Sequence, residues 1–133
     1  MKSAGSQRWR DLLFLHWPVD PAPLQALLPR GLQVDLFEGA AYVGLVLFAR
    51  ERARPAWLPS ALAFRYLETN VRAYVRVPGR GPAGVYFFSL DAASRLAVWG
   101  ARAGFGLPYF HAAMHFEKAR TFVYESRRTG RSP

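Results

Sequence analysis

The sequence predicts an α+β protein, in which a largely antiparallel sheet and two short helices form one domain. Three observations lead to this fold class. A length of 133 residues suits a single domain. Hydrophobic residues make up 51% of the chain and aromatic residues 15%, which is sufficient for a buried core. Successive apolar segments are joined mostly by short turns, which favours antiparallel neighbours. We expect an ordered core at residues 7–126 and a flexible tail at 127–133.

The chain opens with a predicted strand from Arg8 to Trp17, where Trp, Leu and Phe recur in loose alternation. Asp20 followed by Pro21 is typical of a helix start, because the carboxylate caps free amides and proline suits the first turn. A short amphipathic helix is predicted there, with an apolar stripe at Leu24, Leu27 and Leu28.

Glu38 and Gly39 form a two-residue hairpin signal between the apolar segments 32–37 and 40–50. The second segment is apolar almost throughout, so we expect a central strand. Residues 53–60 contain two prolines and are predicted to form a loop.

A long strand is predicted at residues 63–77, with Val and Ala on one face and Arg72 and Arg76 on the other. Residues 78–82 form a Pro/Gly turn, and a return strand follows at 85–90.

Asp91 is a predicted cap for a second helix, which Gly104 and Gly106 end. A final hairpin is predicted from segments 109–116 and 121–125. The buried side of the second helix is expected to comprise Leu96, Trp99, Gly100 and Ala103.

The net charge of +9 comes almost entirely from arginine, since the only lysines are Lys2 and Lys118. A basic balance permits nucleic-acid or acidic-partner binding. The arginines are scattered, however, so we keep this interpretation as an alternative only. The one local cluster lies in the tail, at Arg127, Arg128 and Arg131.

Features that the sequence lacks exclude several classes of site and of protein. The chain has no cysteine, which rules out disulfides, thiolate catalysis and cysteine-ligated metals. The apolar run at 12–15 is too short for a signal-peptide core, and the low-charge stretch at 39–49 is far below the roughly 20 residues that span a bilayer. We therefore expect a cytoplasmic protein without membrane attachment.

His111 and His115 have the i, i+4 spacing of a two-ligand zinc site, and Glu117 is a third candidate ligand on the same strand face. Ala112 occupies the position of the general-base glutamate in a His-Glu-x-x-His motif. The alternative is a pair of partly exposed strand histidines, so we expect no metal.

Glu68 and His16 are the candidate acid–base residues. Glu68 lies in a strand among aromatic neighbours, where the pKa of a carboxylate rises. The alternative is an edge-strand residue paired with Arg65 or Arg72. His16 lies at the end of the first strand in a run of Leu and Trp, and a hydrogen-bonded core histidine is the alternative there.

Three segments resemble acetoacetate decarboxylase: Gly106-Leu107-Pro108-Tyr109-Phe110, the helix start at Asp20-Pro21, and Tyr66-x-Glu68. Longer phrases, such as residues 9–18, 42–45 and 87–92, resemble the bacterial family called domain of unknown function 2071, or YqjF-like proteins. This resemblance covers residues 7 to about 126. It implies an open or partial cone of antiparallel strands around an internal pocket.

The resemblance also implies where the site lies. Its pocket would be lined by His16, Trp17, Glu68, Tyr109 and Phe110, and no cofactor is expected. The Schiff-base lysine of the decarboxylases falls on Tyr109 or Phe110, and their arginine after the first strand falls near Trp17 or Pro18. Schiff-base catalysis needs an amine of lowered pKa, so we do not expect that reaction.

Members of the family usually continue beyond this length, so strands that would close the cone are missing, and we expect a homo-oligomer or a shortened chain. Three functions remain open. The first is small-molecule binding in an aromatic pocket. The second is a lyase or hydrolase that acts without an imine on a small carbonyl compound, using Glu68 and His16. The third is binding of nucleic acid or an acidic partner.

Overall fold

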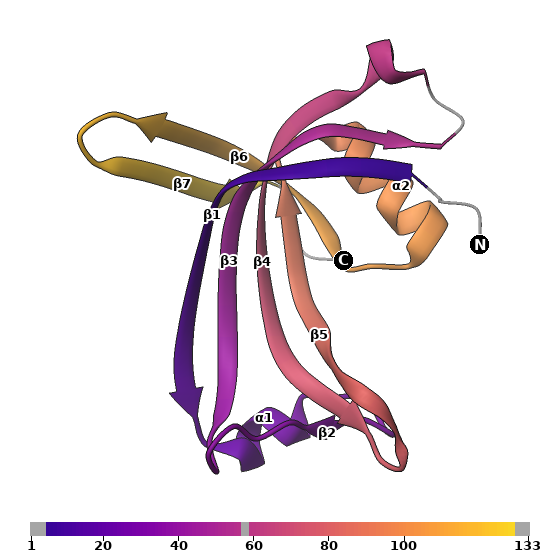
Figure 1. Ribbon diagram of the computed structural model, residues 1–133, viewed down its shortest axis with the longest axis vertical. Helices are drawn as coiled ribbons and strands as arrows, with labels where there is room; N and C mark the ends of the chain where they lie inside the picture. Colours follow the sequence, from indigo (N-terminus) through magenta and orange to yellow (C-terminus); the bar gives the residue numbers. More distant parts are fainter. Residues whose placement is uncertain (1–4, 57–58, 130–133) are drawn as a thin grey trace.

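Four long antiparallel strands form the body of the protein (Figure 1). The computed structural model describes residues 5–56 and 59–129. The hydrogen-bonded order is β1-β3-β4-β5-β6-β7, with β2 paired to β4. These elements confirm the predicted class of a mostly antiparallel sheet with two helices. The strands are β1 (Gly5–Val19), β2 (Gln33–Val34), β3 (Ala41–Pro55), β4 (Phe64–Val77), β5 (Arg80–Ala92), β6 (Tyr109–Lys118) and β7 (Phe122–Arg128).

The sheet bends sharply at two bulges. The β1–β3 register shifts between Arg10 and Leu13, and the β3–β4 register shifts between Arg50 and Ala53. Within these intervals Asp11 has φ 50° and Arg52 has φ 51°, the left-handed conformation that an extra bulge residue adopts. In Figure 1 the sections of β1, β3 and β4 beyond the bulges run across the top of the sheet.

The first helix, α1 (Pro21–Ala26), begins as predicted, because the Asp20 side chain accepts a hydrogen bond of 3.0 Å from the Ala22 amide. The turn at Glu38 and Gly39 is also present, and both residues have positive φ. The pairing expected on either side of it is wrong. Only Phe37 and Ala40 form a bridge across the turn, whereas β2 pairs with β4.

The second helix, α2 (Arg95–Phe105), connects β5 to β6, which run parallel. Ser94 caps it, not Asp91, because the Ser94 hydroxyl accepts from the Ala97 amide. Gly106 ends it in the left-handed conformation. The strand assigned to 85–90 is longer than predicted, since β5 includes the residues from Arg80 to Ala92. A short 3-10 turn, η1 (Ser60–Leu62), precedes β4.

The predicted buried side of α2 is wrong. Leu96 and Trp99 are 65% and 70% exposed, while Val98 is buried. Val98 packs in a cluster with Leu90 and Ala92 of β5 and Tyr109 of β6, so the helix buries this side and leaves its other large apolar residues outside.

The two helices pack on opposite faces of the sheet. Leu24 of α1 packs on Ala41, Ala73 and Val75. We call the opposite face, under Val98 of α2, the α2 face; its buried apolar members are Val46, Phe48, Leu90, Ala92 and Tyr109. Figure 1 shows α1 across the lower end of the sheet and α2 beside its upper part. Within residues 5–56 and 59–129, no helix is long and apolar enough to cross a bilayer.

Arg127 and Arg128, which we assigned to the tail, belong to β7, and Arg128 forms an ion pair with Asp91. Residues 130–133, including Arg131, lie outside the described residues.

Candidate functional site

A line of polar side chains follows β4 along the α2 face. Because strand side chains alternate between faces, Tyr66, Glu68, Asn70, Arg72 and Tyr74 all belong to one face. We call these five residues the β4 stripe. Neighbouring strands contribute side chains to the same face, at the positions that pair with these residues. These side chains differ along β4, so the two halves of the stripe have different surroundings.

The first half is closed around Glu68, which is 1% exposed. Nη2 of Arg50 lies 3.0 Å from each of its two carboxylate oxygens. The Tyr109 hydroxyl donates to Oε2 at 3.0 Å. The guanidinium of Arg50 lies 5.7 Å from the ring centroid of Phe48 and 5.6 Å from that of Tyr66. Glu68 therefore has a charged partner and a neutral donor inside an aromatic enclosure.

Burial shapes the acid–base properties of this cluster. It raises the pKa of Glu68, and the attraction of Arg50 and the hydrogen bond from Tyr109 only partly offset that rise. Burial also raises the pKa of Tyr66 to about 12 and increases the pKa of Tyr109. Burial is the largest single influence on Arg50 and would lower its pKa, but Glu68, Tyr109 and Tyr66 together outweigh it and the net pKa is raised. Arg50 stays charged and both phenols stay protonated near neutral pH.

The β6–β7 hairpin holds the backbone of this half. The Tyr124 hydroxyl donates to the Glu68 carbonyl oxygen at 3.0 Å, and the Thr69 hydroxyl donates to Tyr124 at 3.1 Å. Burial raises the pKa of Tyr124, so its hydroxyl also remains a donor. These contacts fix β4 where Glu68 meets Arg50.

The second half of the stripe is more open. Nη2 of Arg72 donates to the Tyr74 hydroxyl at 3.0 Å, and that hydroxyl lies 2.5 Å from Nε2 of His16. The Arg72 guanidinium also lies 5.3 Å from the ring centroid of Phe14. Gly44 leaves room for these groups, because a Cβ there would lie only 3.2 Å from Nε2 of His16 and 3.4 Å from Cγ of Arg72.

The predicted site residues fall in three places. Glu68 and Tyr109 meet directly. His16 lies in the other half, beside Arg72; the four residues from Arg72 to Glu68 span about 13 Å of strand. Trp17 and Phe110 follow His16 and Tyr109 on their strands, so they lie on the opposite face of the sheet.

Phe110 instead packs against arginines, with the guanidinium of Arg128 3.8 Å from its ring centroid and that of Arg102 5.4 Å away. The sequence interpretation missed Arg50 and Tyr74, and it named Arg72 only on the polar face of its strand and as an alternative partner for Glu68. The alternation along β4 was the available signal for Tyr74. Nothing local to Arg50 indicated that it would meet Glu68.

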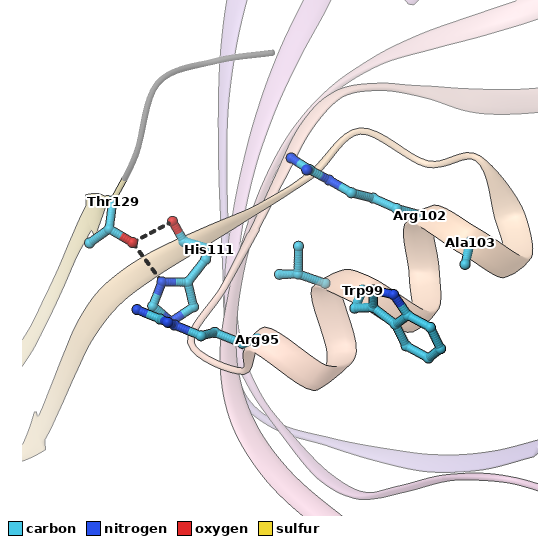
Figure 2. Close-up of a pocket in the computed structure, with 7 residues that line it drawn as sticks. Arg95, Trp99, Arg102, Ala103, His111 and Thr129 are labelled. Carbon is cyan, nitrogen blue, oxygen red and sulfur yellow. Dashed lines mark hydrogen bonds between the residues drawn. The ribbon is translucent and has the colours of Figure 1, made fainter.

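A cavity of about 570 Å³ lies between α2 and β6 (Figure 2). His111 is held there by a contact of 2.6 Å between its Nδ1 and the Thr129 hydroxyl. Figure 2 shows the Arg95 side chain beside the His111 ring. The lining residues are Arg95, Val98, Trp99, Arg102, Ala103, His111 and Thr129. Among the residues that the structure describes, no group of three or more His, Asp or Glu side chains could hold a metal ion, so His111 and His115 have no third ligand there.

Two comparisons by sequence place the chain in a family. The model of the DUF2071 family, described as "Uncharacterized conserved protein", matches residues 6–133. The chain is 47% identical over 113 residues to "Uncharacterized protein YqjF" of Bacillus subtilis (strain 168), which covers 84% of this chain and 46% of that protein. The chain thus spans about half the length of this relative.

Solved structures share the fold at low sequence identity. An acetoacetate decarboxylase-like enzyme from Sphingomonas wittichii RW1 has a TM-score of 0.66 and 21% identity, covering 90% of this chain and 46% of its own. Acetoacetate decarboxylase from Legionella pneumophila has a TM-score of 0.62 and 19% identity, covering 92% and 45%. The enduracididine biosynthesis enzyme MppR, in complex with pyruvate, has a TM-score of 0.65 and 14% identity, covering 91% and 46%. These likenesses show the fold, and the sequence matches show the family: the chain belongs to the DUF2071 family and has an acetoacetate decarboxylase-like fold.

Proposed function

We propose that this protein binds a small organic molecule along the β4 stripe and does so without forming an imine. The observation that carries the proposal is the buried cluster of Arg50, Glu68 and Tyr109. Placing a charged pair in the interior is costly, and an apolar trio of similar volume would often be at least as stable. Perturbed, buried ionisable groups gather at functional sites. The solved neighbours include an enzyme in complex with pyruvate, which supports a small ligand.

Lysine chemistry is not part of the proposal. Tyr109 and Phe110 follow Pro108, and the Tyr109 hydroxyl is bonded to Glu68. Lys118 lies at the end of β6, where its half-exposed ammonium forms an ion pair of 2.7 Å with Asp11. Imine formation needs an amine activated by its surroundings, and this ion pair at the strand end provides no such activation.

The geometry favours binding over the acid–base alternative. A lyase or hydrolase that used Glu68 and His16 together would need both groups within hydrogen-bond reach of one reacting bond. Glu68 instead lies in the closed half of the stripe, whereas His16 of β1 lies beside the other half, about 13 Å away along the strand direction. Glu68 is also engaged by Arg50 and Tyr109.

The proposal is tested by screening small polar molecules against ¹⁵N-labelled protein by NMR. Ligands should shift signals from residues 66–74 in a saturable way. Tyr109→Phe, which removes the phenol that orients Glu68, should weaken the affinity severalfold, as the loss of one hydrogen bond to a charged group does. Tyr86→Phe is the matched control, because Tyr86 packs with the α1 core cluster on the opposite face. Binding that maps away from the stripe, or that Tyr86→Phe weakens equally, would contradict the proposal.

We further propose a homo-oligomer assembled through β1. This strand is an edge of the sheet, and it exposes large apolar side chains on both faces. A long apolar edge offers unpaired backbone groups to another strand. Two-fold pairing would satisfy the edge of both chains at once. The exposed β1 side chains include Trp9, Leu12, Leu13, Phe14, Leu15 and Trp17.

A further inference from the structure

We propose that Arg72, Tyr74 and His16 form a subsite that binds the carboxylate of a small organic acid. This inference rests on the proposed function and adds the chemical class of the ligand to it. We call these three residues the Arg72 subsite.

The first argument is charge compensation. Arg50 and Arg72 lie on the same face of the sheet, and both are partly buried. Arg50 has Glu68 as its partner, but no carboxylate in the described part of the chain lies within 4.0 Å of the Arg72 guanidinium. A partly desolvated cation without a counter-charge is unfavourable. An anionic ligand would supply the missing charge.

The second argument is the supply of unused donors. A guanidinium has five N–H donors. Within residues 5–56 and 59–129, the bond from Nη2 to Tyr74 is the only hydrogen bond that the Arg72 side chain makes, and its Nε is buried without an acceptor. The rings of Phe14 and Tyr74, at 5.3 and 5.4 Å, hold the guanidinium by cation–π contacts that consume no donor.

Tyr74 and His16 together supply a second hydrogen-bond donor, the Tyr74 hydroxyl, beside the Arg72 guanidinium. The Tyr74 oxygen already accepts from Arg72. When Nε2 of His16 carries a proton and donates across the 2.5 Å contact, the same oxygen accepts twice, and the phenol O–H is free to donate to a ligand. Gly44 supports this arrangement because it keeps the strand beneath His16 and Arg72 free of a side chain.

The third argument is access. Glu68 is enclosed, whereas His16 is exposed and Phe14 is 45% exposed. A ligand can therefore approach Arg72 over the α2 face, which edge-to-edge pairing through the backbone of β1 leaves open. The class of anion follows from the donors: one planar guanidinium fork and one hydroxyl suit a monoanionic carboxylate, which Arg binds through two parallel bonds.

The test uses propionate and its neutral isostere propionamide as probes, titrated into the ¹⁵N-labelled full chain and followed by ¹H–¹⁵N NMR. We expect propionate to shift the signals of residues 16, 72 and 74 in a saturable way, and propionamide to bind at least about tenfold more weakly. Arg72→Gln should weaken propionate at least about tenfold, and Tyr74→Phe severalfold.

Arg76→Gln is the control, because Arg76 lies on the same strand, carries the same charge and is paired with Asp35. It should leave propionate affinity unchanged. Equal binding of propionate and propionamide, or equal loss in Arg72→Gln and Arg76→Gln, overturns the subsite but leaves the proposed function standing. The absence of saturable shifts on the stripe with both probes overturns the subsite, and the wider screen of small polar molecules then decides the proposed function. The dispersed spectrum of each variant confirms its fold, and Arg72→Lys, which keeps the charge but not the fork, replaces Arg72→Gln if that variant unfolds.

Discussion

The two halves of the β4 stripe contain the same kind of cation in opposite circumstances. Arg50 pairs with Glu68, which is 1% exposed. The Arg50 guanidinium itself lies against two aromatic rings. Arg72 lies on the same face, also against two rings, but its hydrogen-bond partner is the neutral Tyr74. The difference shows that residue type and face do not decide what an arginine does. Two things decide whether the charge of an arginine is compensated within the protein or is left for a ligand: how near the closest carboxylate lies, and how far other side chains enclose the site.

The largest expected effect is a difference in protein stability between substitutions of the two arginines. Arg50→Gln should lower the free energy of unfolding by about 3–5 kcal/mol near neutral pH, because Glu68 would stay buried without its partner. Arg72→Gln should change it by less than about 1 kcal/mol, since no buried carboxylate loses a partner. Urea unfolding of both variants measures this, with Arg76→Gln as the surface control. Equal losses for Arg50 and Arg72 would mean that both are structural residues.

The second expected effect concerns assembly, because the open half of the stripe adjoins β1. Light scattering should report a mass of at least twice 15.0 kDa at micromolar concentration. Leu13→Lys should shift the equilibrium towards monomer, since it places a charge on the exposed apolar edge. Leu27→Lys, which changes an exposed leucine beyond α1, is the matched control. A monomeric wild-type chain would show that the edge needs no partner.

The third expected effect concerns pH. The pKa of Glu68 is raised in the folded protein above its ordinary value of 4.5. The folded state therefore binds more protons than the unfolded state in the interval above pH 4.5, and stability should fall as the pH rises through it. Glu68→Gln should remove this part of the pH dependence. The measurement is urea unfolding of both proteins at several pH values, with Glu125→Gln as an exposed control. A wild-type stability that rises across this interval as steeply as that of Glu68→Gln would contradict the raised pKa.

The smallest expected effect is the absence of a reaction. Borohydride treatment in the presence of acetoacetate or acetopyruvate should give no covalent adduct by mass spectrometry, because Lys118 is held by Asp11 and no lysine follows Pro108. A stable adduct on Lys118 would contradict this prediction.

Several local features could be predicted because short-range physics determines them. Asp20 followed by Pro21 starts α1, and the alternation along β4 identifies one strand with two distinct faces. Glu68 was predicted as a candidate site residue because it is a carboxylate in a strand among aromatic neighbours, and it is buried. The same alternation means that His16 and Trp17, as neighbours on one strand, face opposite sides of the sheet and cannot line one pocket.

Other features depended on how distant segments align. Glu68 was expected to pair with Arg65 or Arg72, if it was not a pocket residue, but its partner is Arg50 of the neighbouring strand. That pairing follows from a register in which Phe48 lies opposite Glu68 and Arg50 lies opposite Tyr66. Likewise, the cap moved from Asp91 to Ser94 because Asp91 belongs to β5 and meets Arg128 of β7.

The sequence by itself determined the α+β class, the start of α1, the two-sided character of β4 and the family to which the chain belongs, because these depend on residues close together along the chain. Only the tertiary structure decided that Arg50 and not Arg72 compensates Glu68, that β5 and β6 run parallel, and that Tyr109 closes the buried cluster. The reason is physical: strand register, bulges at Asp11 and Arg52, and the crossover through α2 set which side chains meet, and none of these is specified by a local pattern.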